Sequence, residues 1–215
     1  GYDEARTRAR RAAVAAIQEA TGYWTVAQHT AAPGSVSLSD VIRTFERFLE
    51  PQDLLTLDAG SNRIWATSQL KIRTPGQLIV PGGIGGMGWG PPAAAAAKLV
   101  HPGKRVTCLV GDGGFMMTMP VLTTCVQNDL PIVVVVANNS GLGMVRDNLK
   151  ASPIAVDYAD IDFARIAEGL GCKGLRVDAP GQLDDALAEA HRSGVPCVID
   201  VTVDPESSHG QVSHY

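Results

Sequence analysis

The chain has 215 residues, which is enough to bury one substantial hydrophobic core, and we expect one main domain. Apolar residues make up 45% of the sequence and charged residues 19%, which is ordinary for a soluble α/β protein. The net charge of −4 gives no basis for binding nucleic acid, and no apolar stretch is long enough to cross a membrane.

The cysteines and histidines show no metal-ligand spacing. The four cysteines lie far apart without a CxxC pair, and the five histidines are equally scattered. Three of the cysteines fall in or beside apolar, strand-like stretches, so we interpret them as buried thiols and not as disulfide partners or zinc ligands. This cysteine usage is typical of a reducing compartment, and we expect a cytoplasmic protein.

Residues 1–36 are expected to form an N-terminal helix and a linker arm. Alanines and charges recur at helical spacing over residues 2–20, and Gly22 ends the pattern. The basic run RTRARR within it is interpreted as a solvated helix face, with contact to RNA or a membrane as the alternative. Ser37 then provides the cap for a helix that runs to Leu49 and begins the main domain, residues 37–205.

Strands and helices are expected to alternate through this domain. Apolar, strand-like stretches occur at residues 54–57, 78–80, 106–110, 132–136, 174–177 and 197–203. Helical patterns intervene at residues 63–69, 92–99, 116–128, 162–169 and 182–192. The alternation predicts a doubly wound, mostly parallel six-stranded sheet with helices on both faces. Residues 206–215 are expected to form a C-terminal tail.

Polar residues follow two of these strands where the chain leaves the sheet. Gly111-Asp112-Gly113 ends the third strand and Asn138-Asn139 ends the fourth. Ligands of an open α/β sheet bind beyond the carboxyl ends of its strands, so the carboxylate and the amide should meet in one crevice. A few hard oxygen ligands suit Mg²⁺, which keeps part of its shell for phosphate oxygens and water. The pattern predicts a metal-bridged diphosphate site.

Four stretches of the chain resemble those of thiamine diphosphate (ThDP) enzymes, whose signature is GDG…NN. The stretches are residues 58–65 (DAGSNRIW), 82–93 (GGIGGMGWGPPA), 111–117 (GDGGFMM) and 138–145 (NNSGLGMV). From about residue 41 to 203 the chain is similar to the cofactor-binding C-terminal domain of the acetolactate synthase and pyruvate oxidase group. The resemblance implies the ThDP-binding fold, with ThDP and Mg²⁺ as cofactors.

The resemblance also implies roles for individual residues. Asp112 and Asn139 would bind the metal through their side chains, and Gly141 through its backbone carbonyl. Diphosphate oxygens would be held by free N–H groups at a helix start and by the loop after the first strand. The residues concerned are Gly113, Gly114, Phe115, Gly60, Ser61 and Asn62, and Gly143 and Met144 complete the cofactor-binding set. Capping of the following helix is the alternative role for Ser61 and Asn62.

The glycine-rich loop has two interpretations. By resemblance, Met87 supports the bent V conformation of ThDP, and Gly85 and Gly86 let the backbone approach the aminopyrimidine; a core methionine is the alternative for Met87. The run from Gly83 to Gly88 also satisfies GxGxxG, a dinucleotide-binding pattern. Against the dinucleotide alternative, Trp89, Gly90 and two prolines delay the helix whose N-terminus the pyrophosphate would need.

The glutamate that activates ThDP is missing from the expected site. In the family it comes from the pyrimidine-binding domain of a neighbouring subunit, and the seven glutamates here all fall in charged helix patterns or the tail. We therefore expect a heteromer with a pyrimidine-binding subunit, a second copy of that pair, and a small 2-oxo acid such as pyruvate as substrate. The activity implied is decarboxylation with transfer of the C2 unit.

Departures from the family pattern leave other functions open. Pro120-Val121-Leu122 replaces a common Glu-Leu pair, and Arg146-Asp147-Asn148 replaces a Gln-Trp segment. We also expect the chain to lack the central domain that can carry FAD in the family. The alternatives are a decarboxylase or lyase without carboligation, a C-terminal domain excised from a three-domain enzyme, and a non-catalytic nucleotide-binding module.

Overall fold

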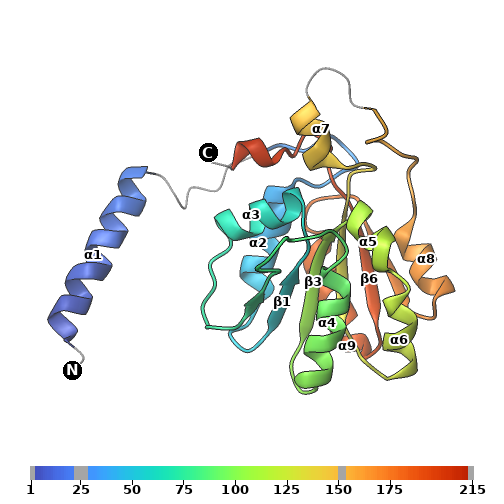
Figure 1. The fold of residues 1–215 in the computed structure, drawn as a ribbon, viewed down its shortest axis with the longest axis horizontal. Helices are drawn as coiled ribbons and strands as arrows, with labels where there is room; N and C mark the ends of the chain where they lie inside the picture. Colours follow the sequence, from blue (N-terminus) through green and yellow to red (C-terminus); the bar gives the residue numbers. More distant parts are fainter. Residues whose placement is uncertain (1–2, 22–28, 150–153, 213–215) are drawn as a thin grey trace.

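The computed structural model describes residues 3–21, 29–149 and 154–212 of the chain. Within these residues, six strands form one sheet in the order β2-β1-β3-β4-β6-β5, and every neighbouring pair is parallel. The strands are β1 (Leu54–Leu57), β2 (Leu78–Ile79), β3 (Val106–Gly111), β4 (Val133–Asn138), β5 (Lys173–Val177) and β6 (Cys197–Thr202). The predicted doubly wound, six-stranded α/β fold is confirmed, and the sheet is entirely parallel (Figure 1).

Two hydrophobic cores lie on opposite faces of the sheet. One contains buried residues of three helices: α2 (Leu38–Phe48), α3 (Ser61–Gln69) and α9 (Gln182–Ser193). The other contains buried residues of four: α4 (Gly90–Val100), α5 (Asp112–Thr118), α6 (Val121–Gln127) and α8 (Phe163–Gly169). The central strands are buried on both faces, as expected for a parallel sheet covered by helices.

The helix expected at residues 116–128 is two helices, α5 and α6. They meet at Pro120, which lacks the N–H group that a continuous helix would need. The break confines α5 to the seven residues from Asp112 to Thr118. A further helix, α7 (Gly143–Leu149), follows the Asn138-Asn139 motif and was not expected from the sequence.

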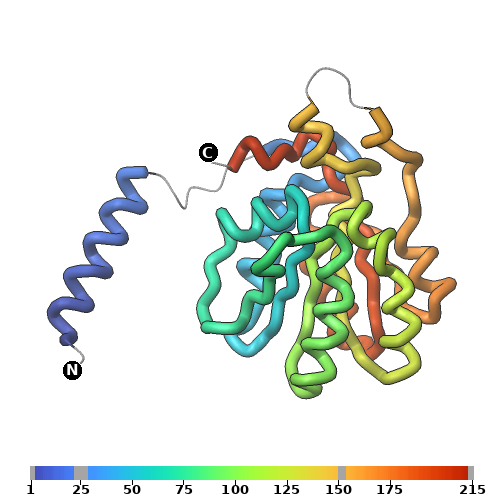
Figure 2. The backbone as a smooth tube through the Cα atoms, in the orientation of Figure 1, coloured from blue at the N-terminus to red at the C-terminus, as the bar shows by residue number. Residues whose placement is uncertain are grey.

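The N-terminal helix α1 (Glu4–Thr21) has no buried residue, and Figure 1 shows it apart from the sheet. The backbone trace continues from residue 29 into the sheet domain (Figure 2). The expected cap at Ser37 is present, because its side chain accepts a hydrogen bond from the Asp40 N–H at 3.1 Å and starts α2. The expected linker is only partly covered, since residues 22–28 lie outside the described residues.

At the other end, the chain closes with a short 3-10 helix, η1 (His209–Gln211). Among the described residues, no helix is both long enough and apolar enough to cross a membrane. The four cysteines are buried and free.

Candidate functional site

A cavity of about 270 Å³ opens at the carboxyl ends of β1, β3 and β4. It brings together most of the residues singled out from the sequence, which come from four separate loops. These residues are Gly60, Ser61, Asn62, Gly85, Met87, Asp112, Gly113, Gly114, Asn139, Gly141, Gly143 and Met144. Because parallel strands end at the same edge of a sheet, motifs more than 80 residues apart in sequence converge here.

Asp112 lies at the centre of this arrangement and is 2% exposed. One carboxylate oxygen accepts a hydrogen bond from the Gly113 N–H at 2.7 Å. The other accepts from the N–H groups of Asn139 and Gly141, each at 3.1 Å. Burial raises the pKa of the Asp112 carboxyl above its ordinary value, and the donors around it oppose this only in part. A bound cation would stabilise the charged form of this carboxylate.

The two asparagines after β4 have different surroundings. The Asn138 side chain donates to the Ile161 carbonyl and the Asp200 carboxylate, both at 3.0 Å, and accepts from the Ser140 N–H. Asn138 therefore ties the loop to the sheet. The side chain of Asn139 lines the cavity and lies so close to Gly143 that a Cβ atom there would be 2.5 Å from its Nδ2. Glycine at 143 leaves room for that amide.

The loop between β1 and α3 leaves one hydroxyl without a partner. The Ser61 Oγ is buried and makes no hydrogen bond with any described residue. The N-cap of α3 is Gly60, at φ 122°, and no side chain caps the helix. Asn62 donates instead to the carbonyls of Asp58 and Leu109, at 3.2 and 3.3 Å. The structure therefore does not support helix capping as the role of Ser61 or Asn62.

The start of α5 is open to the cavity through glycines. A Cβ atom at Gly113 would lie 2.7 Å from Cδ2 of Leu142 and 3.1 Å from Cε of Met87, so a side chain there would fill the cavity. Phe115 lies elsewhere: its ring is fully buried and packs edge-on against Phe163, with 5.4 Å between the centroids. The helix begins at Asp112, so its free N–H groups belong to residues before Phe115.

Residues of the glycine-rich loop line both the cavity and a neighbouring groove. Gly85 and Met87 line the 270 Å³ cavity, whereas Gly86 lines only a neighbouring groove. Met87 is 41% exposed, which argues against a core methionine. The start of α4 is already occupied, since the N–H groups of Trp89 and Gly90 donate to Asp58 and are followed by two prolines. Few N–H groups remain there for a dinucleotide pyrophosphate.

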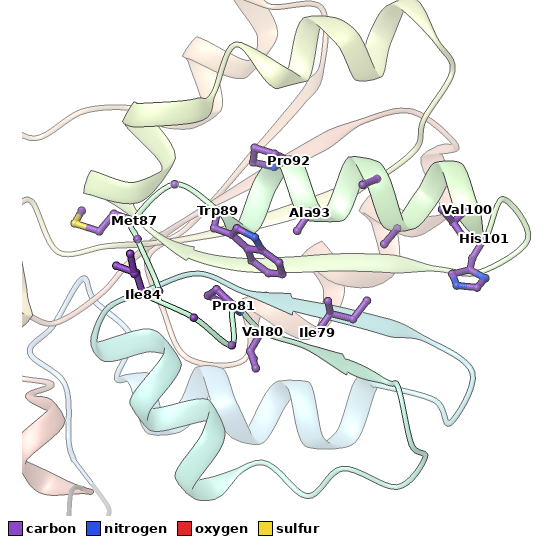
Figure 3. Close-up of a pocket in the computed structure, with 17 residues that line it drawn as sticks. Ile79, Val80, Pro81, Ile84, Met87, Trp89, Pro92, Ala93, Val100 and His101 are labelled. Atoms are coloured by element: carbon purple, nitrogen blue, oxygen red, sulfur yellow. The ribbon is translucent and has the colours of Figure 1, made fainter.

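The neighbouring groove has a volume of about 1060 Å³ and a mostly apolar lining. Figure 3 shows it between the end of β2, the glycine-rich loop and α4, with Trp89 beside α4 and His101 at its far end. Ile84 is fully exposed on the loop, and Val80 and Val100 are also exposed. This surface is continuous with the cavity, because Gly85 and Met87 line both.

Several residues at the cavity were not expected from the sequence. Those lining it are Leu38, Ala59, Gly111, Ala137, Leu142, Val145 and Val203. Gly111 and Leu142 stand inside the recognised motifs, so the motifs themselves could have indicated them. Leu38 and Val203 come from distant elements, and no local pattern marks them.

Tyr158 also reaches the site from an unexpected segment. Its backbone N–H donates to Ser140, and Leu142 donates to Val156 at 2.7 Å, so residues 154–158 lie antiparallel to the loop after β4. The buried Tyr158 hydroxyl is beside Asp112 but makes no well-aligned hydrogen bond with a described residue. Burial, together with the neighbouring Asp112 carboxylate, raises the pKa of Tyr158.

A family model described as "Thiamine pyrophosphate enzyme, C-terminal TPP binding domain" matches residues 58–201. The chain belongs to this family. The match includes all four loops that form the cavity, so the expected ThDP-binding fold and family are confirmed.

The relatives of the chain include acetolactate synthases. It is 35% identical over 164 residues to a probable acetolactate synthase large subunit of Methanococcus aeolicus, covering 74% of this chain and 27% of the relative. It is also 35% identical over 168 residues to the acetolactate synthase of Bacillus subtilis, covering 77% and 30%. The chain thus spans less than a third of the length of these relatives.

A solved structure shares the fold. The thiamine diphosphate-dependent 4-hydroxybenzoylformate decarboxylase of Rhodococcus jostii superimposes with a TM-score of 0.77 at 24% identity, covering 84% of this chain and 35% of that one. At this identity the similarity concerns the fold alone.

In the part of the chain that the structure describes, no three His, Cys, Asp or Glu side chains come together as metal ligands do. The site around Asp112 instead offers one carboxylate, one amide and backbone carbonyls. Such a donor set suits a cation that also takes ligands from a phosphate.

Proposed function

We propose that this chain is the diphosphate- and Mg²⁺-binding part of an acetolactate synthase-like ThDP enzyme that decarboxylates a 2-oxo acid such as pyruvate and transfers the C2 unit. The observation that carries the proposal is the buried Asp112 carboxylate, which joins the two halves of the family signature. The family match and the acetolactate synthase relatives support the assignment to this branch.

The residues present fit ThDP with Mg²⁺. Asp112 is buried, and no Lys, Arg or His of the described part of the chain forms an ion pair with it. The buried Ser61 hydroxyl lacks a partner that a diphosphate oxygen could supply. In this proposal Asp112, the Asn139 side chain and the Gly141 carbonyl hold Mg²⁺, and Ser61 and the amides at the start of α5 hold the diphosphate.

The remaining residues of the cavity orient the cofactor and keep water out. Met87 lies against the start of α5, where it would support the angle between the two rings of ThDP. Leu142, Met144 and Val145 add apolar side chains to the lining of the cavity. When bound, ThDP supplies the nucleophilic carbon and the electron sink that decarboxylation of a 2-oxo acid requires.

The activating carboxylate is proposed to come from a pyrimidine-binding partner. All seven glutamates of the chain lie in described residues, and none of them is buried or lines the cavity. The exposed apolar groove in Figure 3 begins at Met87, beside the expected position of the aminopyrimidine. A partner docked on this groove could place a glutamate at the cofactor, and a second copy of the pair would complete the assembly.

The test combines this chain with a pyrimidine-binding chain or domain of a ThDP enzyme, together with Mg²⁺, ThDP and pyruvate. The proposal predicts release of CO₂ and a product in which a new carbon–carbon bond has formed, and neither component alone should be active. Release of CO₂ with free aldehyde as the only other product would contradict the transfer step. Absence of turnover with every 2-oxo acid would contradict the proposed function.

A further inference from the structure

Asp58 is a fully buried carboxylate that binds three consecutive backbone N–H groups. It follows β1 directly and accepts hydrogen bonds from Gly88 at 2.9 Å, Trp89 at 2.8 Å and Gly90 at 3.1 Å. No cation pairs with it among the residues that the structure describes. Burying a charge is costly unless hydrogen bonds compensate it. The three N–H groups therefore stabilise the buried carboxylate, and the carboxylate in turn holds these three backbone groups in place.

Asp58 also contacts two further segments of the cavity, its own loop before α3 and the start of α5. Its backbone carbonyl accepts a hydrogen bond from the Asn62 side chain at 3.2 Å. At the start of α5, a Cβ atom on Gly114 would lie 2.0 Å from the Asp58 Oδ2, so the carboxylate can pack this closely only because residue 114 is glycine. One residue therefore links the Ser61 loop, the glycine-rich loop and the helix α5, which begins at Asp112.

Near Met87, the hydrogen bonds of Asp58 are the only ones that hold the glycine-rich loop in the described part of the chain. No hydrogen bond joins residues 81–87 to another described residue, and the first fixed backbone group after that stretch is the Gly88 N–H. Met87 directly precedes this group. The hydrogen bond from Gly88 to Asp58 is thus the nearest one that restrains the backbone at Met87.

We propose that Asp58 is a positioning residue that holds the Met87 loop at the distance from the diphosphate end that ThDP, with its two rings, requires. This inference rests on the proposed function. It predicts that Asp58 affects the binding of the whole cofactor but not the binding of diphosphate alone. The competing role is that Asp58 only caps α4, which has no side-chain cap of its own.

The experiment is calorimetric titration of the full chain and its Asp58→Asn variant with Mg²⁺ plus ThDP and, separately, with Mg²⁺ plus inorganic diphosphate. We expect the variant to bind ThDP at least tenfold more weakly and diphosphate within about twofold of the unmodified chain. Asp53→Asn is the matched control: Asp53 is 2% exposed and stands at the opposite end of the same strand. It should leave both affinities unchanged.

Equal losses for both ligands, or no loss for either, would overturn the positioning role while leaving the proposed function intact. An unmodified chain that binds neither ligand would overturn the proposed function itself.

Hydrogen exchange of the unmodified chain tests the same inference if Asp58→Asn does not fold. The amides of residues 88–90 should exchange much more slowly than those of residues 82–86. Equal exchange in the two segments would overturn the role of Asp58 as the anchor.

Discussion

The carboxylate of Asp112 accepts a hydrogen bond from the backbone N–H of Gly141 at 3.1 Å, across 29 residues of sequence. This contact joins the end of β3 to the loop after β4. The metal-binding groups proposed here are therefore held close together by the protein alone, which lowers the cost of ordering them when a cation binds.

Asp112→Asn should weaken binding of ThDP at least tenfold, about 1.4 kcal/mol, when measured by calorimetry in the presence of Mg²⁺. The substitution keeps the shape of the side chain but removes the negative charge that the cation would contact. A large excess of Mg²⁺ should restore part of the affinity.

Asp178→Asn is a suitable control for this prediction. Asp178 is exposed, follows the edge strand β5 and lies outside the cavity. Asp147 is a less suitable control, because its carboxylate binds the Ser208 hydroxyl at 2.7 Å and the His209 ring at 2.9 Å. If Asp112→Asn and Asp178→Asn bind ThDP equally well, the metal assignment is wrong.

Ser61→Ala should separate ligand binding from stability. The Ser61 hydroxyl has no partner in the described structure, so its removal should not lower the melting temperature of the free chain. The affinity for Mg²⁺–ThDP should fall roughly three- to tenfold, the equivalent of one hydrogen bond of about 1 kcal/mol. Thermal melts with and without ligand give both quantities. Unchanged affinity would remove Ser61 from the diphosphate site.

Ile84→Asp should weaken association with the pyrimidine-binding partner without changing ThDP binding to the isolated chain. Ile84 is fully exposed at the apolar groove, and a charge there would be costly to bury in an interface. We expect at least a tenfold loss in affinity for the partner, measured by sedimentation or surface binding. Val195→Asp, at an exposed position outside the groove, is the control. Equal effects of the two substitutions would exclude the groove as the docking surface.

We predict that the buried His191 side chain lowers the free energy of unfolding in mild acid, compared with neutral pH. Burial, together with the positive charge of Arg105, lowers the pKa of His191 from 6.5 to about 4. Between these two values the unfolded chain binds a proton that the folded chain does not, so stability is lost as the pH falls from 6.5 towards 4. At about 1.4 kcal/mol per pKa unit, the loss is on the order of 3 kcal/mol.

The comparison that isolates this effect is His191→Gln. The variant should lose less unfolding free energy than the unmodified chain between pH 7 and pH 4.5, as measured by denaturant titration. His191 lies beside Thr107 and Phe48, far from the cavity, so ThDP binding should not change. Parallel pH profiles for the two proteins would contradict the assignment to His191.

The motif residues and the sheet could be predicted because their signals are local. Six apolar stretches predicted the six strands, and three of the four motifs have polar residues at a strand end, where parallel topology brings them together. Pro120 was visible in the sequence, but the helical pattern on both sides of it concealed the break between α5 and α6.

The contacts between distant segments could not be predicted. Asp58 appears in the sequence only as part of a family stretch, and its bonds to residues 88–90 depend on how β1 lies against α4. Tyr158 reaches Asp112 because residues 154–158 fold back along the loop after β4, and no periodicity marks that return. Such long-range contacts follow from the packed fold and not from local sequence.

Calorimetric titration of the chain with ThDP, with and without Mg²⁺ and in parallel with NAD, tests the proposed cofactor site most directly. We expect ThDP to bind only when Mg²⁺ is present, inorganic diphosphate to compete with it, and NAD not to bind measurably. Preference for NAD, or binding of ThDP that does not depend on Mg²⁺, would contradict a metal-bridged diphosphate site at Asp112.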